Sequence, residues 1–188
     1  ARAMQQNLTS GSVFQNVVRF SLPYLLSYFL QTLYGMADLF IVGQFEPVAA
    51  TTAVSIGSQV MHMLTVMLVG LAMGTTVSIA QAIGANKKDD AAAATGNTVT
   101  LFLILSVCLT GALLCVIRPI TMIMSVPEEA VSGTIAYLTI CFIGIPFITA
   151  YNIISSIFRG MGDSKSPMYF IAVACVANII LDYIFIGL

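Results

Sequence analysis

Residues 20–42 read FSLPYLLSYFLQTLYGMADLFIV, an almost uninterrupted apolar run whose single charged residue is Asp38. About 20 such residues, coiled as an α-helix, cross the hydrocarbon core of a bilayer. A carboxylate in that setting is costly, so it normally faces the interior of a helical bundle or a water-filled cavity. This stretch therefore predicts a transmembrane helix with one polar side directed at other helices.

The rest of the chain repeats this pattern. Of the 188 residues, 59% are hydrophobic and 8% are charged, and the mean hydropathy is +0.97. A soluble domain needs far more charge, and the apolar runs are too continuous for the alternating strands of a membrane β-barrel. We predict an all-α integral membrane protein forming a single transmembrane domain, residues 1–188. Its five helices are expected at about residues 20–42, 49–83, 91–117, 131–158 and 167–188.

Basic residues are unevenly distributed among the polar segments that flank the spans. If the amino end is cytoplasmic, six of the seven Lys and Arg residues lie on the cytoplasmic side. Because basic loops favour that side, we expect a multi-pass protein of the inner (plasma) membrane with its amino end inside. The six residues are Arg2, Arg19, Lys87, Lys88, Arg159 and Lys165, and the seventh is Arg118.

The connections between the spans are short and polar, with residues 118–130 joining the third span to the fourth. No repeat is visible within the five spans, although many transporters are built from symmetry-related repeats. The chain reaches Leu188 directly after an apolar run, without a polar tail. We therefore expect the sequence to be part of a longer chain with a second set of helices.

Polar side chains accompany both intramembrane aspartates at helical spacing. Gln31, Tyr34 and Asp38 form a stripe at positions i, i+3 and i+7 of the first span. Asn178 lies one turn before Asp182, the single charge of the fifth span. An amide can hold a carboxylate in place, and a desolvated carboxylate favours a bound proton or Na⁺. We interpret both groups as functional and able to take up and release a proton, with a structural hydrogen-bonded clasp as the alternative.

Other residues in the spans carry weaker signals. Pro23 and Pro146 each remove a helical hydrogen bond, so both are expected to bend their helices. Gly70 and Gly74 form a G-x-x-x-G pattern that predicts close packing between helices rather than a binding site. His62 is the one ionisable residue of the second span. We expect it to form a hydrogen bond that supports helix packing, with a role in proton relay as the alternative.

Motifs of several enzyme classes are missing from the sequence. There is no phosphate-binding loop, no H-E-x-x-H and no G-x-S-x-G, and the four cysteines lack C-x-x-C spacing. No basic patch with interleaved aromatic residues indicates a nucleic-acid partner. We expect no catalysis, no cofactor and no metal other than Na⁺ as a coupling ion. A membrane-embedded enzyme and a purely structural membrane protein are the alternatives from other classes.

Four segments, in order along nearly the whole chain, resemble the multidrug and toxic compound extrusion family, above all its DNA-damage-inducible and archaeal branches. Residues 23–43 (PYLLSYFLQTLYGMADLFIVG) resemble its first helix, and residues 81–91 (QAIGANKKDDA) its cytoplasmic Gly-Ala turn. Residues 158–168 (FRGMGDSKSPM) are similar to its arginine-glycine-aspartate loop, and residues 178–182 (NIILD) to its fifth-helix pair.

This resemblance implies twelve helices in two six-helix lobes around a central cavity, with these residues supplying five helices of the first lobe. It implies export of small amphipathic or cationic compounds in exchange for inward H⁺ or Na⁺, with the bilayer and the second lobe as partners. A lipid or oligosaccharide flippase of the same broad superfamily is the alternative, although its usual cavity cations are missing from these spans. The implied residues are Tyr34, Asp38, Asn178 and Asp182 for cation coupling, Tyr137 and Asn152 for the cavity lining together with Gln31 of the polar stripe, and Pro23 for the bend.

Overall fold

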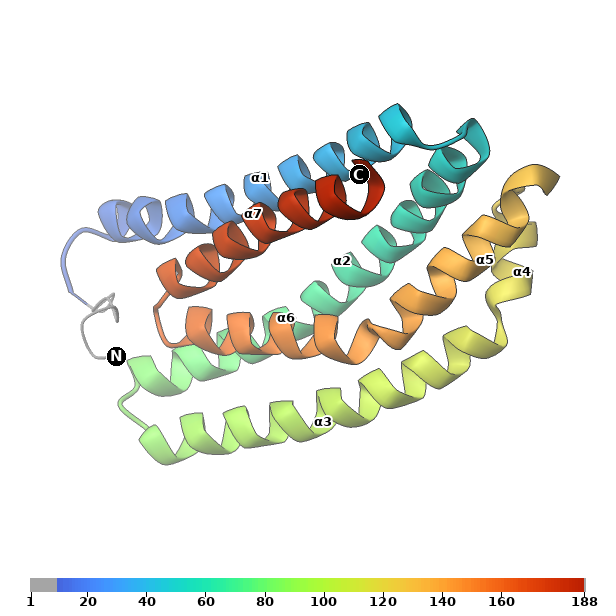
Figure 1. The fold of residues 1–188 in the computed structure, drawn as a ribbon. Coiled ribbons are helices and arrows are strands. Elements are labelled where there is room, and N and C mark those ends of the chain that lie inside the picture. Colours follow the sequence, from blue (N-terminus) through green and yellow to red (C-terminus); the bar gives the residue numbers. More distant parts are fainter. Residues whose placement is uncertain (1–9, 188) are drawn as a thin grey trace.

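The computed structural model describes residues 10–187, which are helical almost throughout and contain no strand. Four of the helices are long and apolar enough to cross a membrane, and α5 and α6, bent by 48° at their junction, pass the same test as a pair. The predicted all-α bundle is thereby confirmed, with five spans when this bent pair is counted as one. The helices are α1 (Val13–Phe45), α2 (Val48–Gly84), α3 (Lys88–Cys115), α4 (Ile117–Ile123), α5 (Glu128–Ile143), α6 (Ile145–Gly160) and α7 (Lys165–Gly187) (Figure 1).

The helices extend beyond the apolar runs that predicted them. Hydropathy marks the segment in lipid, whereas the backbone hydrogen bonds of a helix continue into the polar flanks. Thus α1 begins at Val13 rather than near residue 20, and α3 begins at Lys88 rather than near residue 91. Asp89 and Asp90 lie in the first turn of α3, where negative charge interacts favourably with the amino end of the helix dipole.

Two parts of the chain differ from the sequence-based expectation. Residues 118–130 are not simply a polar connection, because they contain most of α4 and the start of α5. Ile117 and Thr121 of α4 are buried, so this short helix packs its apolar side inward. The fourth span is broken at Gly144, and Pro146 lies in the first turn of α6. The bend predicted for Pro146 is confirmed, since proline cannot continue the preceding hydrogen-bond pattern.

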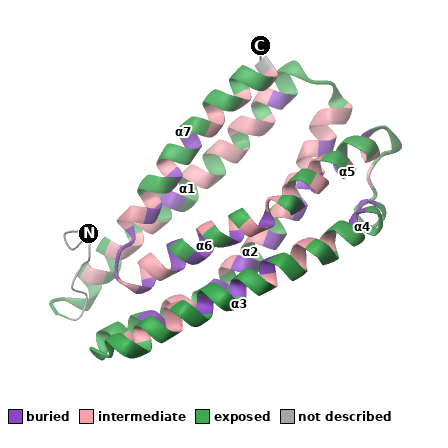
Figure 2. Ribbon diagram, turned by 60° about the horizontal axis from the view of Figure 1, so that its bottom comes forward, coloured by how far each residue is buried: buried purple, intermediate pink, exposed green. Residues whose placement is uncertain are grey.

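The helices form two groups (Figure 1). α1 packs along α7, whereas α2 packs against α3, α5 and α6. The groups meet where α1 turns into α2 and where α6 turns into α7, and α1 makes no close backbone contact with α5 or α6. Buried residues gather on the facing sides of α2, α5 and α6 (Figure 2), where Leu64, Leu138 and Phe142 form the centre of the core.

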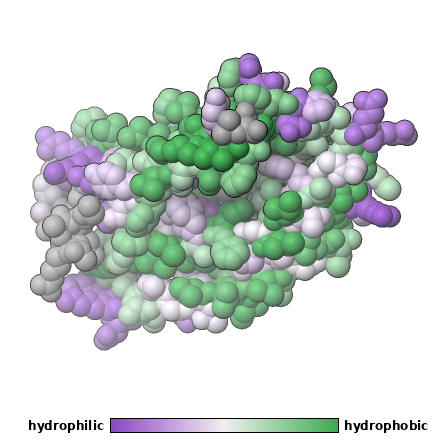
Figure 3. Space-filling model, in the orientation of Figure 1, coloured by the Kyte–Doolittle hydropathy of each residue, from purple (hydrophilic) through white to green (hydrophobic). Residues whose placement is uncertain are grey.

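The surface is apolar in the middle and polar at both ends (Figure 3). Large hydrophobic side chains such as Phe40 and Phe147 are exposed in the apolar belt, as expected for lipid-facing positions. One end holds the start of α1 and the α2–α3 and α6–α7 turns, and the other holds the α1–α2 turn and α4 (Figure 1). Arg118 is therefore at the end opposite the other basic residues, except Arg2, which lies outside the described residues. The side of the membrane that each end faces stays a prediction.

The G-x-x-x-G pattern does not mark close helix packing among the described helices. A Cβ atom built on Gly70 or Gly74 would meet no neighbour within 4 Å, so both glycines face outward. The close approach occurs instead at Gly160 of α6, where a Cβ would lie 2.9 Å from Cβ of Ile79 and 3.0 Å from the carbonyl oxygen of Thr76, both on α2.

Candidate functional site

Two carboxylates from different spans belong to one group of polar residues, here called the polar cluster. It comprises Tyr34, Asp38, Tyr137, Asn178 and Asp182. All five side chains are partly buried. Asp38 of α1 interacts electrostatically with Asp182 of α7 and with Tyr137 of α5. The structure therefore brings the first and last spans together at their only aspartates. The role of the cluster in cation coupling stays a prediction.

Asp182 has a hydrogen-bond partner on its own helix. The side-chain amide Nδ2 of Asn178 donates to Oδ2 of Asp182 over 2.8 Å, because residues four apart lie one above the other on a helix. This bond orients the carboxylate through Oδ2 and does not involve its second oxygen, Oδ1. Tyr34 stands on α1 one turn before Asp38, and its hydroxyl is also within electrostatic range of Tyr151 on α6.

Tyr137 is held in the cluster by a contact that no sequence motif indicated. Its hydroxyl lies 3.0 Å from Oγ of Ser58 on α2. Beside it, Gly57 provides the space for the ring, because a Cβ at this position would overlap the ring carbons of Tyr137. The contact joins residues far apart in the sequence, so neither residue could be identified from local spacing.

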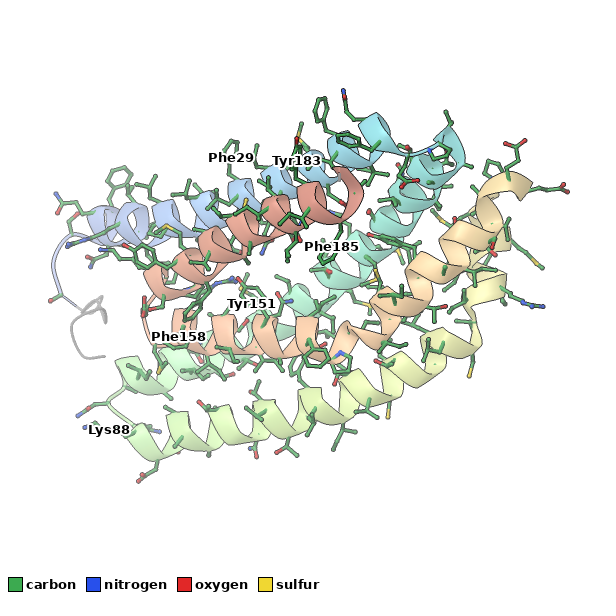
Figure 4. All side chains as sticks on the ribbon, viewed as in Figure 1. Phe29, Lys88, Tyr151, Phe158, Tyr183 and Phe185 are labelled. Carbon is green, nitrogen blue, oxygen red and sulfur yellow. The ribbon has the colours of Figure 1, made fainter. Side chains whose placement is uncertain are left out.

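Arg159 is a second residue that sequence reasoning missed. It was assigned to the polar connection after the fourth span, but it lies in the last turn of α6. Its guanidinium carbon is 4.6 Å from the ring centroid of Tyr24 on α1, and it also interacts with Tyr151. Figure 4 shows Tyr151 in the space between α6 and α7. The statement that the spans contain no cation is therefore wrong for α6.

The remaining candidate residues make no hydrogen bond to the carboxylates in the described part of the chain. Asn152 is buried and donates from Nδ2 to the carbonyl oxygen of Ile148 over 2.8 Å, within its own helix. Gln31 is partly buried on α1, one turn before Tyr34. Pro23 lies inside α1, which continues through it as one helix. The cavity roles of Asn152 and Gln31 and the bend at Pro23 stay predictions.

Neither aspartate of the polar cluster forms a salt bridge. Between residues 10 and 187, the single ion pair within 4 Å joins Lys87 and Asp90 over 3.5 Å, on the exposed turn before α3. The same region contains no group of three or more His, Cys, Asp or Glu side chains arranged to hold a metal ion. Asp38 and Asp182 therefore lie on adjacent helices without a basic side chain within 4 Å to neutralise them.

Membrane-length helices that carry intramembrane carboxylates are typical of transporters. The MatE family model matches residues 23–184, and the chain belongs to this family, the multidrug and toxic compound extrusion family of the resemblance. It is 31% identical over 176 residues to "Probable multidrug resistance protein YoeA" of Bacillus subtilis (strain 168), covering 94% of this chain and 38% of that protein.

Solved structures agree with this assignment. "Crystal structure of MATE in the bent conformation" superposes with a TM-score of 0.88 at 32% identity, covering 95% of this chain and 40% of the other. A Pyrococcus furiosus transporter described as having a binding pocket of reverse polarity, which "suggests different function", superposes with a TM-score of 0.87 at 32% identity, covering 95% of this chain and 39% of the other. The chain thus spans about two fifths of the length of these relatives, which corresponds to one lobe.

Proposed function

We propose that the chain is the first lobe of a secondary active multidrug exporter. The whole transporter would move small amphipathic or cationic compounds outward in exchange for inward H⁺ or Na⁺. Membership of the MatE family and the similarity to a probable multidrug resistance protein support this proposal. The basic residues at one end support an inner-membrane protein whose amino end is cytoplasmic.

The observation that supports the proposal most is that Asp38 and Asp182, on the two packed helices α1 and α7, lie within electrostatic range of each other and that neither has a salt-bridge partner in the described chain. A charged Asp at the centre of a membrane helix costs about 3 kcal/mol, and two like charges in proximity repel each other. Binding of one H⁺ or Na⁺ between them removes a charge or balances it. The pair is therefore a site whose occupancy by a cation strongly affects the energy of the lobe.

The neighbours of the carboxylates have distinct roles in this proposal. Asn178 orients Asp182 through its amide donor. Tyr34 places a hydroxyl beside Asp38, and Tyr137 closes the cluster from α5. A bound Na⁺ prefers several oxygen ligands, as hard cations do, and these side chains offer carboxylate, amide and hydroxyl oxygens. Gln31 and Asn152 would extend the polar lining toward the cargo.

Coupling requires that cation and cargo bias the same conformational equilibrium. α1 contacts α7 along its length but approaches α2 only near their turn, so a change of charge at Asp38 or Asp182 acts directly on the α1–α7 pair. A ligand shifts an equilibrium only through its different affinity for the two states. Cation binding favours close packing of the carboxylates, and release of the cation favours a state in which cargo binds.

This proposal is tested with the full-length transporter in vesicles that carry an imposed H⁺ or Na⁺ gradient. Asp38→Asn and Asp182→Asn remove each charge with little change in size, and each is expected to abolish gradient-driven export of a cationic dye. Asp89→Asn, on the exposed start of α3, is the matched control and should export normally. Normal export by both cluster variants would disprove the proposal.

A lipid or oligosaccharide flippase is the second candidate, and the half-buried Arg159 is the observation that favours it. A cation beside the polar face could attract an anionic headgroup or phosphate-linked sugar. Translocation of a fluorescent anionic lipid, without gradient-dependent export of cationic dyes, would favour it over multidrug export.

A further inference from the structure

The polar face of α1 extends further than the stripe around Asp38. It continues through Gln31 and Ser27 to Tyr24, at steps of three, four or seven residues that keep side chains on one face of a helix. Ser27 is buried, and its hydroxyl donates to the carbonyl oxygen of Pro23 over 2.8 Å. The face therefore runs from the carboxylates toward the end of the bundle that carries the α6–α7 turn.

Arg159 meets this face at its far end. The guanidinium group lies over the ring of Tyr24, with 4.6 Å between the guanidinium carbon and the ring centroid. On its own helix, Ser155 and Tyr151 lie one and two turns before it, so the three share one side of α6. No carboxylate lies within 4 Å of Arg159 in the described chain, since the ion pair there is Lys87–Asp90.

The contact joins two helices whose backbones do not come close to each other. The backbones of α1 and α6 make no close contact along their described lengths. Arg159 and Tyr24 therefore bridge the α1–α7 pair and the α2–α6 group through side chains alone. The nearest backbone link is the α6–α7 turn, where Asp163 accepts hydrogen bonds from the amides of Lys165 and Ser166. A hydrogen-bonded turn and a side-chain bridge therefore connect the two helix groups at the same end of the lobe.

We propose that Arg159 and Tyr24 form the inner closure of the cation site, which holds α1 against α6 and repels coupling cations at that end. This inference rests on the proposed function and adds two residues to it. A desolvated guanidinium over a tyrosine ring is a favourable cation–π pair. Its positive charge, without a carboxylate nearby, raises the energy of any H⁺ or Na⁺ that passes along the polar face of α1. Access from the cytoplasmic end then requires that the ring leave the guanidinium.

The competing explanation is that Arg159 only anchors the end of α6 at the membrane surface. A basic residue in the last turn interacts favourably with the helix dipole, and long basic side chains reach the interface by extending along apolar surface. In that case the ring of Tyr24 would be incidental, and removing it would not open the site. The two explanations therefore differ in what they predict for Tyr24.

The test uses the full-length transporter in proteoliposomes, with uncoupled cation leak measured by a trapped pH- or Na⁺-sensitive dye in the absence of cargo. Tyr24→Leu removes the ring, Tyr24→Phe keeps its π face, and Arg159→Gln removes the charge. Tyr28→Leu is the matched control, because Tyr28 lies one turn further along α1 and is 53% exposed. A second readout is cytoplasmic labelling of Cys175, which is buried on α7, by an impermeant maleimide after the other cysteines are replaced.

Tyr24→Leu and Arg159→Gln are each expected to raise leak and labelling on the order of tenfold, as loss of a cation–π pair predicts. Tyr24→Phe and Tyr28→Leu should stay near the parent. If Tyr24→Leu has normal thermal stability and shows no increase in cation leak or in labelling of Cys175, the inference is overturned, whether or not Arg159→Gln leaks. If the parent itself exports without any gradient dependence, the proposed antiport fails. If the parent is gradient-driven and Tyr24→Leu is silent, only the closure fails.

Discussion

The hydroxyl group of Tyr137 on α5 lies 3.0 Å from Oγ of Ser58 on α2, directly beside Gly57, against which the ring packs. This contact ties the polar cluster to the most deeply buried part of the bundle. α2 packs against α3, α5 and α6, so Tyr137 is anchored to the larger of the two helix groups and not to the α1–α7 pair.

We expect substitutions at this support to displace Tyr137. Gly57→Ala adds a methyl group into the ring and should destabilise the protein by about 1–3 kcal/mol. Ser58→Ala removes one hydrogen bond, worth about 1 kcal/mol, and should weaken the cation dependence of export. Thermal unfolding and export assays check both effects. Gly70→Ala is the control, since Gly70 faces open space. Equal effects of Gly70→Ala and Gly57→Ala would contradict the packing account.

The start of α7 depends on Asp163, which is 5% exposed. Its Oδ1 accepts hydrogen bonds from the amides of Lys165 and Ser166, each at 3.0 Å. Asp163→Ala should lower stability by about 1–2 kcal/mol, as loss of a helix cap does. Asp90→Ala, which breaks an exposed ion pair and removes one of two acidic residues from the first turn of α3, should change stability by less than about 1 kcal/mol. Thermal unfolding in detergent measures both. Equal stability of the two variants would show that the turn is not held by Asp163.

Pro23 lies within a continuous α1, on the same helix as Asp38. A proline lacks the amide donor and crowds the preceding turn, so the helix can bend there at low cost. We expect Pro23→Ala to reduce export by the full-length protein severalfold at near-normal expression. Pro47→Ala, in the exposed turn between α1 and α2, is the control. Unchanged export by Pro23→Ala would make the proline a passive feature of the helix.

The orientation in the membrane is tested by thiol labelling in a background without the native cysteines. A cysteine in place of Lys87 is expected to be protected from an impermeant reagent added outside intact cells. One in place of Pro127, at the opposite end of the bundle (Figure 1), should react. The basis is the excess of Lys and Arg at one end. The reverse labelling pattern would overturn the orientation and, with it, the direction assigned to transport.

The sequence predicted the apolar helices and singled out the two aspartates for physical reasons that are local. Lipid demands long apolar runs, and a charge such as Asp38 or Asp182 stands out against them. The pairing of Asn178 with Asp182 follows from helical spacing alone. Each of these inferences needs only residues that are close together in the chain.

What the sequence did not predict depends on contacts between distant segments. The ring of Tyr137 packs against Gly57, and the guanidinium of Arg159 lies over the ring of Tyr24. Only the tertiary structure shows that these residues are close together. Arg159 was assigned to a connection because a charge at the edge of an apolar run is as compatible with a polar loop as with a last helical turn. Gly70 is the opposite case: its G-x-x-x-G pattern is local and predicted close helix packing, but the glycine faces outward and no described helix packs against it.

The most direct test of the account is cation counterflow driven by cargo in proteoliposomes that contain the full-length transporter. With no imposed ion gradient, a cargo gradient should drive H⁺ or Na⁺ in the opposite direction, which a trapped ion-sensitive dye records. Asp38→Asn and Asp182→Asn should each abolish this counterflow even where cargo still binds, because the cation loses its site between α1 and α7. Normal counterflow with normal pH or Na⁺ dependence in both variants would show that the two aspartates are structural and that the proposed coupling is wrong.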